Sequence, residues 1–141
     1  MVLAIDAGFR CLGWALMDAG KVIGFGVIET RAGGTKRGVR VADDDARRCA
    51  EQARELVEVI RDARDRGGLL CAVVELPSGG AQSARAARSL GMATAIVAST
   101  LDLMSVPTEW TTPGEGKLAA SGKRSGSKAE VIEGAIAQTG W

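Results

Sequence analysis

The chain has 141 residues, of which 46% are hydrophobic and 25% charged, with a formal net charge of only +1. This length and composition predict one globular domain over residues 1–141 that buries its own core, and no apolar run approaches the roughly 18 residues of a membrane span. The sequence begins directly on an apolar segment without the pattern of a secretory leader, so we expect a cytoplasmic protein. Histidine is absent, which excludes His-based triads and His-ligated metals.

The first third of the chain predicts three strands. Apolar and β-branched residues dominate the segments 2–6, 10–17 and 22–29, and the tight turn Asp18-Ala19-Gly20-Lys21 joins the last two. An antiparallel meander follows from this order. We expect the aromatic residues here and later in the chain to pack in the core or on the sheet; they are Trp14, Phe25 and Trp110.

The strongest helix signal covers residues 42–65. Its apolar positions recur every three or four residues and predict one buried stripe beneath a charged face. The stripe comprises Ala46, Cys49, Ala50, Ala53, Leu56, Val57, Ile60 and Ala63. Cys11, Cys49 and Cys71 are an odd, widely spaced set, which predicts reduced core thiols rather than disulfides or a zinc site.

The second half of the chain alternates between strands and helices. Gly67-Gly68 ends the first helix, and we expect a strand at 69–75, a helix at 82–104 and a short strand at 107–111. Residues 112–126 are rich in glycine and predict a mobile loop, after which Ser127 caps a last helix. The predicted fold class is therefore α/β: a mixed sheet with helices on its faces.

Two acids end apolar strands, Asp6 after the first and Glu75 after the fourth. A carboxylate in such a position is costly unless it is solvated, paired or bound to a metal. If the two strands are neighbours, the two acids meet and can hold one cation. The alternative is that each acid is a structural partner of an arginine.

The order of four motifs resembles the RuvC-type Holliday-junction resolvases of the ribonuclease H-like superfamily. The motifs are Ile5-Asp6-Ala7-Gly8, Gly13-Trp14-Ala15, Val74-Glu75-Leu76-Pro77 and Ser127-Lys128, and they span nearly the whole chain. This resemblance implies a five-stranded mixed sheet and a metal-dependent endonuclease that cuts four-way DNA junctions as a symmetric homodimer. The implied cofactor is Mg²⁺, with Mn²⁺ as an alternative, because hard cations prefer carboxylate, water and phosphate oxygens.

The resemblance also implies roles for individual residues. Asp6 is similar to the family's bridging metal ligand and Glu75 to its second acid, while Gly8 would let the backbone pass close to the metal or phosphate. Lys128 resembles the lysine that faces the scissile phosphate, and Lys117 a second functional lysine. The helix at 82–104 is the expected dimer face.

Basic residues outside these motifs are candidates for DNA contacts, with solvated surface charges as the alternative. The predicted DNA-binding residues are Arg85, Arg88, Lys123 and Arg124, and a second basic group comprises Lys36, Arg37 and Arg40.

The sequence departs from the family pattern in two loops. Ala7 and Phe9 stand where the family commonly has proline and a small polar residue. The loop Ser78-Gly79-Gly80-Ala81-Gln82 lacks the aromatic residue that stacks on a junction base, a contact that contributes about 1–3 kcal/mol. Opening of the junction therefore depends on Phe9 or on another contact.

A further departure concerns the acids that complete the family's site, which lie in a C-terminal helix that this chain does not contain. We considered a truncated product, a different completing acid, and a protein that binds junctions without cutting them. Glu130 and Glu133 share a helix face and are the substitutes in question, with a solvated face as the simpler interpretation.

Three functions are consistent with the sequence. The first is a junction-resolving endonuclease, and the second is a catalytically incomplete module that binds junction DNA. The third is a fragment of an actin-like or sugar-kinase-like phosphotransferase, suggested by Asp6-Ala7-Gly8.

Overall fold

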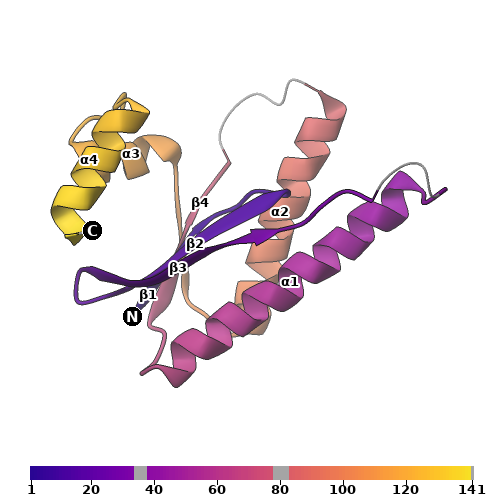
Figure 1. Cartoon of the computed structure of the whole chain (residues 1–141), viewed down its shortest axis with the longest axis horizontal. Helices are drawn as coiled ribbons and strands as arrows, with labels where there is room; N and C mark the ends of the chain where they lie inside the picture. Colours follow the sequence, from indigo (N-terminus) through magenta and orange to yellow (C-terminus); the bar gives the residue numbers. More distant parts are fainter. Residues whose placement is uncertain (34–37, 78–82, 141) are drawn as a thin grey trace.

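The computed structural model describes residues 1–33, 38–77 and 83–140 (Figure 1). The chain opens with three strands, β1 (Val2–Asp6), β2 (Cys11–Asp18) and β3 (Lys21–Glu29), which pair as the predicted antiparallel meander. In the β2–β3 turn Ala19 and Gly20 have φ values of 47° and 80°, the left-handed conformation that tight hairpins require.

The parallel part of the sheet follows. The elements are helix α1 (Val41–Asp65), strand β4 (Cys71–Glu75), helix α2 (Ala84–Leu103) and strand β5 (Thr108–Thr111). β4 pairs in parallel with both β1 and β5, so the five strands have the order β3-β2-β1-β4-β5. The predicted mixed sheet is confirmed.

The last part of the chain is a helical hairpin, α3 (Pro113–Ser121) followed by α4 (Lys128–Thr139). The expected mobile loop at 112–126 is wrong, because α3 occupies most of it. Thr112 and Glu115 form a reciprocal capping box, and Gly122 ends the helix at a φ of 73°. These local signals outweigh the glycine content of the segment. α4 begins after Ser127, as predicted.

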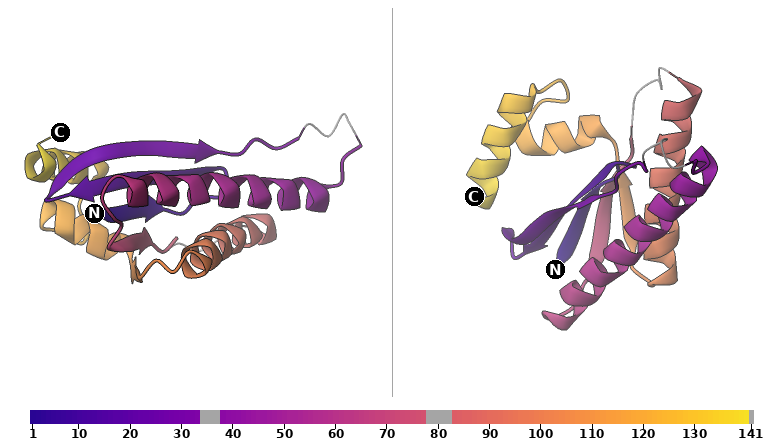
Figure 2. Two further views of the ribbon diagram at one scale, coloured as in Figure 1. Left: turned by 90° about the horizontal axis from the view of Figure 1, so that it is seen from below. Right: turned by 45° about the vertical axis from the view of Figure 1, so that its right-hand side comes forward.

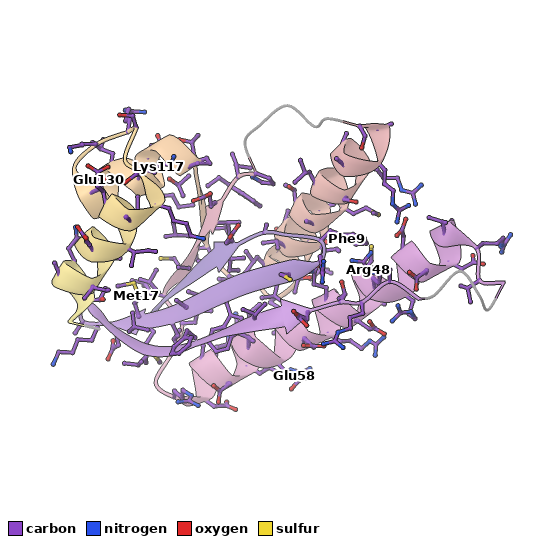
Figure 3. The ribbon with its side chains drawn as sticks, turned by 45° about the horizontal axis from the view of Figure 1, so that its top comes forward. Phe9, Met17, Arg48, Glu58, Lys117 and Glu130 are labelled. Atoms are coloured by element: carbon purple, nitrogen blue, oxygen red, sulfur yellow. The ribbon has the colours of Figure 1, made fainter. Side chains whose placement is uncertain are left out.

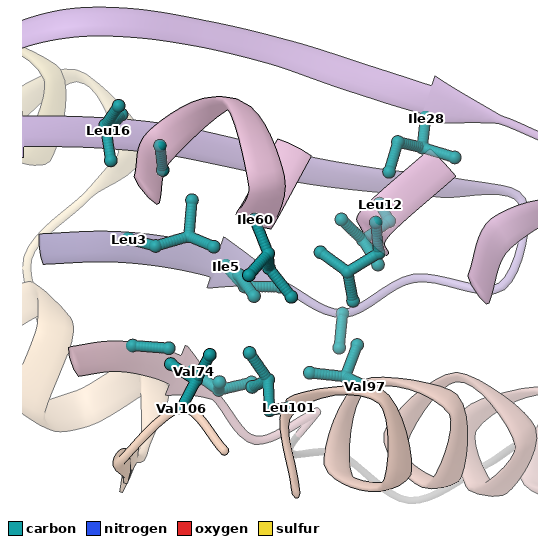
Figure 4. Packing of buried hydrophobic residues seen from close by; sticks show 14 residues of the cluster. Leu3, Ile5, Leu12, Leu16, Ile28, Ile60, Val74, Val97, Leu101 and Val106 are labelled. Atoms are coloured by element: carbon teal, nitrogen blue, oxygen red, sulfur yellow. The ribbon is translucent and has the colours of Figure 1, made fainter. Parts of the chain in front are cut away.

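The core lies between one face of the sheet and the helices α1 and α2 (Figures 2 and 4). Alternate residues of each strand point into it, including Leu3 and Ile5 from β1 and Val74 from β4. Leu56 and Ile60 of α1 and Val97 and Leu101 of α2 close it from the other side. The hairpin α3–α4 lies on the opposite side of the sheet (Figure 2).

The buried stripe of α1 differs from the predicted one. Leu56, Ile60 and Ala63 are buried as expected, but Ala46 and Ala50 are exposed. In the N-terminal half the buried positions are instead polar: Asp44, Asp45, Arg48 and Gln52. Although α1 has 25 residues, no helix in the part of the chain described here is both long and apolar enough to cross a membrane.

The aromatic and cysteine predictions hold only in part. Trp14 packs against the core, where its ring covers Gly26 of the neighbouring strand. Phe25 is 60% exposed on the other face of the sheet and Trp110 is also exposed, so neither is a core residue. All three cysteines are free: Cys49 and Cys71 are partly buried, but Cys11 is exposed, so its prediction as a core thiol is wrong.

Candidate functional site

Asp6 and Glu75 lie side by side at the ends of two parallel strands. They are direct partners in the β1–β4 register, on strands that run about 4.8 Å apart in an ordinary sheet. Since Ile5 and Val74 point into the core, the two carboxylates point to the opposite face, the side on which α3 and α4 lie. The predicted adjacency of the two acids is confirmed.

The two acids share an environment that favours a cation. Partial burial raises the pKa of Glu75, the charge of Asp6 raises it further, and Lys117 lowers it. Among the described residues, no arginine or lysine forms an ion pair with either acid. The alternative that each carboxylate is a structural partner of an arginine therefore does not apply within the described residues.

A shallow groove of about 410 Å³ contains both carboxylates. Most of its lining comes from β1 and β2, where Gly13 stands next to Asp6, and Thr111 of β5 lies beyond Glu75. Trp14 also lines the groove. The groove is open, so a large ligand can reach the two acids.

The hairpin α3–α4 carries two of the predicted lysines, of which Lys117 lies in α3 (Figure 3). Lys117 in α3 is close enough to affect the pKa of Glu75, and a Cβ on Gly116 would stand 3.4 Å from a Glu75 carboxylate oxygen. Lys128 is exposed in the first turn of α4, where a cation is unfavourable beside the positive end of the helix. The structure therefore associates Lys117 with the acids more directly than Lys128.

The turn after Asp6 depends on Gly8 and on two side chains of α1, Arg48 and Gln52, that the sequence analysis did not identify. A Cβ on Gly8 would stand 2.3 Å from the carbonyl oxygen of Cys11, so only glycine fits there. The Gln52 side chain donates a hydrogen bond of 2.7 Å to the Gly8 carbonyl, and Arg48 donates one of 3.3 Å to the Phe9 carbonyl. The missed signal is the heptad-like spacing of Asp45, Arg48 and Gln52 ahead of Leu56.

The predicted DNA-binding arginines of α2 have a protein partner. Arg85 and Arg88 both contact the buried carboxylate of Asp45, although each remains about half exposed. The exposed half of each side chain can still reach a phosphate. Because both arginines pair with Asp45, neither is a simple solvated charge. Lys36 and Arg37 lie outside the described residues, as does the segment 78–82.

The predicted DNA-binding residues of the helical hairpin, Lys123 and Arg124, also have acidic neighbours. Lys123 pairs with Glu130 at 2.7 Å, while Arg124 is exposed and near enough to Glu115 to help lower its pKa. Arg40, from the other basic group, pairs with Asp43 at 2.8 Å.

No third acid joins Asp6 and Glu75 in the part of the chain that the structure describes, where no group of three or more Cys, Asp or Glu side chains could hold a metal. Glu130 is engaged elsewhere: the bond from Lys123 and those from Ser127 lower its pKa to about 2. Glu133 is exposed on α4, as expected for a solvated face.

Two solved structures resemble the whole of this fold. The RuvC of T. thermophilus in complex with a Holliday junction substrate matches 99% of this chain and 79% of its own, with a TM-score of 0.75 at 21% identity. The chain has the RuvC fold. A second structure of Thermus thermophilus RuvC gives a TM-score of 0.71 at 20% identity over 99% of this chain and 80% of its own. No protein-family model and no curated protein matches the sequence.

The residues at this groove fit a divalent cation of the kind that the sequence resemblance implies. Two carboxylates face a common open groove, and the pKa of Glu75 is raised first by partial burial and then by the charge of Asp6, a repulsion that a cation would offset. The donors are carboxylates, which suit Mg²⁺ or Mn²⁺. Asp6 and Glu75 are the residues that would hold it.

Proposed function

We propose that the protein is a metal-dependent endonuclease that resolves four-way or branched DNA junctions. The observation that supports this best is the Asp6–Glu75 pair, two acids brought together by a parallel strand pairing and left without an ion-pair partner among the described residues. The RuvC fold supports the substrate class, since one of the two RuvC structures contains a Holliday junction.

In this proposal Asp6 and Glu75 bind one cation jointly, which requires both to be ionised. A divalent ion bound there supplies charge stabilisation for the attacking and leaving oxygens of a phosphodiester. Lys117, whose charge lowers the pKa of Glu75, favours the ionised form of that carboxyl and adds positive charge on the α3 side of the groove. Lys128 would contact the same phosphate from α4.

DNA would approach the groove from the face of the sheet that carries Asp6 and Glu75. Arg85, Arg88, Lys123 and Arg124 are proposed to contact phosphates, which fix the position of DNA but do not read its sequence. A homodimer with α2 at its interface would present two such grooves to one junction. We place this activity in the cytoplasm.

The test is cleavage of a synthetic four-way junction with Mg²⁺ or Mn²⁺, compared with linear duplex of the same sequence. The wild-type chain should give paired nicks on the junction. Asp6→Asn should lower the rate at least 1000-fold, which corresponds to about 4 kcal/mol, without weakening junction binding in the absence of metal.

Asp18→Asn is the matched control, because Asp18 is also an exposed acid at a strand end but lies in the β2–β3 turn. It should cleave at the wild-type rate. Junctions that stay intact with wild-type protein at every concentration and with either metal would exclude the nuclease.

One observation favours a second candidate, a module that binds junctions without cutting them. Asp6 and Glu75 are joined by no third acid in the described residues. This candidate predicts metal-independent binding to four-way DNA that weakens steeply with salt, and no strand cleavage. The same assay separates the two functions.

A further inference from the structure

A buried polar cluster connects helix α1 to the turn that follows Asp6. Thr30, Arg48 and Gln52 are 1%, 5% and 0% exposed. Polar side chains this deeply buried are unusual, since burial costs free energy unless every donor and acceptor is satisfied. Figure 3 shows Arg48 and Phe9 close together at the end of the sheet.

The donors of this cluster converge on two backbone carbonyls. Gln52 Nε2 donates to the Gly8 carbonyl at 2.7 Å, while the Phe9 carbonyl accepts from Thr30 Oγ1 at 2.8 Å and from Arg48 Nη2 at 3.3 Å. The Arg48 guanidinium also lies 4.1 Å from the centre of the Phe9 ring. The backbone of Gly8 and Phe9 is therefore fixed by hydrogen bonds from three side chains.

The C-terminal half of α1 packs on the sheet in the ordinary way, through apolar side chains. Further along α1, Leu56, Ile60 and Ala63 pack against the sheet without any polar atom. Well-packed apolar residues commonly stabilise a core at least as well as buried charged groups do. The polar half of the helix coincides with the turn beside the catalytic acid, so its role goes beyond stability.

We propose that Arg48 and Gln52 are positioning residues that fix the Gly8–Phe9 backbone and thereby hold the Asp6 carboxylate at the correct spacing from Glu75. This inference rests on the proposed function. Joint ligation of one ion requires side chains held to within about 0.5 Å, and a turn with free carbonyls would not provide that precision.

Asp45, in the preceding turn of α1, completes the cluster. Its carboxylate, 3% exposed as a residue, lies 3.8 Å from Arg48 Nη1 and 3.3 Å from Arg85, and it also contacts Arg88. One buried anion thus serves both the arginine that holds the turn and the two arginines of α2 that are proposed to face DNA. The turn and the start of α2 share one ionic network.

The test compares Gln52→Leu and Arg48→Met with Arg54→Met, a control on the same helix. Arg54 is exposed and has no ion pair or hydrogen bond within the described residues. Backbone ¹⁵N relaxation would report the order parameters of Gly8 and Phe9, and a Mn²⁺ titration would report metal affinity. Cleavage kinetics on a four-way junction would separate kcat from KM.

We expect the order parameters of Gly8 and Phe9 to fall from about 0.85 toward 0.6 in Gln52→Leu and Arg48→Met. Metal affinity and kcat should each fall about 10-fold, as is typical for residues that orient a metal ligand, with KM for the junction within about twofold. Arg54→Met should match the wild type in every measurement.

Unchanged order parameters, or lower thermal stability with metal affinity and kcat intact, would overturn the proposal and leave a structural role only. Gln52→Leu keeps the size and helix propensity of the side chain, so it serves if Arg48→Met does not fold. If the wild type binds no Mn²⁺ and cuts no junction, the proposed function fails, while the order parameters still decide whether these residues hold the turn.

Discussion

Acidic side chains occur in two contrasting settings in this protein. Asp45 is buried and lies among three arginines, Arg48, Arg85 and Arg88. Asp6 and Glu75 lie beside each other in an open groove, and no described arginine or lysine pairs with them. An acid surrounded by arginines holds helices together, whereas two adjacent acids without ion-pair partners oppose folding, which is the arrangement expected of the cation site that we propose.

The largest expected effect is on stability and concerns Asp45, the acid that pairs with arginines. Asp45→Asn leaves three guanidinium groups without their shared anion, and we expect the free energy of unfolding to fall by about 3 kcal/mol. Urea denaturation followed by circular dichroism measures it. Asp43→Asn removes an exposed acid two residues away whose one ion pair among the described residues is with Arg40, so it should change stability by no more than about 0.5 kcal/mol. Equal effects of the two changes would contradict the structural role of Asp45.

The next prediction concerns Lys117. Because its charge lowers the pKa of Glu75, Lys117→Met should raise that pKa and shift the acidic limb of the pH–rate profile to higher pH. We expect junction cleavage at neutral pH to fall about 10-fold, within the range for loss of one charge-stabilising group. Lys21→Met changes an exposed lysine in the β2–β3 turn and should leave the profile in place. An unshifted profile in Lys117→Met would show that this lysine does not act on Glu75.

The unpaired acids predict a smaller effect on stability. The pKa of Glu75 is raised above its ordinary 4.5 in the folded protein, so its stabilising contribution is complete below pH 4.5 and is lost as pH rises through the raised value. Glu75→Gln should therefore raise the Tm of the metal-free protein at pH 7 by about 1–3 °C, because the partly exposed pair is screened by solvent. The difference should vanish near pH 4.

The exposed Glu55 gives the control for that measurement. Glu55→Gln should leave the Tm unchanged at both pH values. Added Mg²⁺ should stabilise the wild type but not Glu75→Gln, because a ligand that binds only the folded state shifts the unfolding equilibrium. Wild-type protein more stable than Glu75→Gln at pH 7 without metal would contradict the proposed repulsion.

A local effect on one helix tests the element that carries Lys117. Thr112→Ala removes the capping box of α3 and should destabilise that helix by about 1 kcal/mol, seen as faster amide exchange in its first turn. Exchange in the sheet should not change, since no residue of α3 is buried. Ser125→Ala changes an exposed serine outside both helices and should have no effect.

The sheet and the main pair of acids could be predicted from the sequence because both depend on short apolar runs. Continuous apolar residues located β1 and β4, and each run ends in an acid. The adjacency of Asp6 and Glu75 needed one further assumption about strand order, which the structure confirms.

The polar half of α1 could not be predicted in the same way. Asp45, Arg48 and Gln52 have the composition of a solvated face, and their burial depends on carbonyl groups and arginines up to 44 residues away in the chain. Helix α3 was missed for a different reason, because its glycines concealed the Thr112–Glu115 capping box. The burial of the polar residues of α1 depends on partners far away in the chain, whereas α3 depends on a capping signal within its own segment.

The α3–α4 hairpin has a further consequence for how the groove opens. The two helices pack mainly against each other, and neither contains a buried residue, whereas β1 and β4 are anchored in the core. The hairpin should therefore swing away at far lower free energy than global unfolding requires. Every residue that lines the groove belongs to the sheet, so the hairpin can move aside without changing the spacing of the two acids.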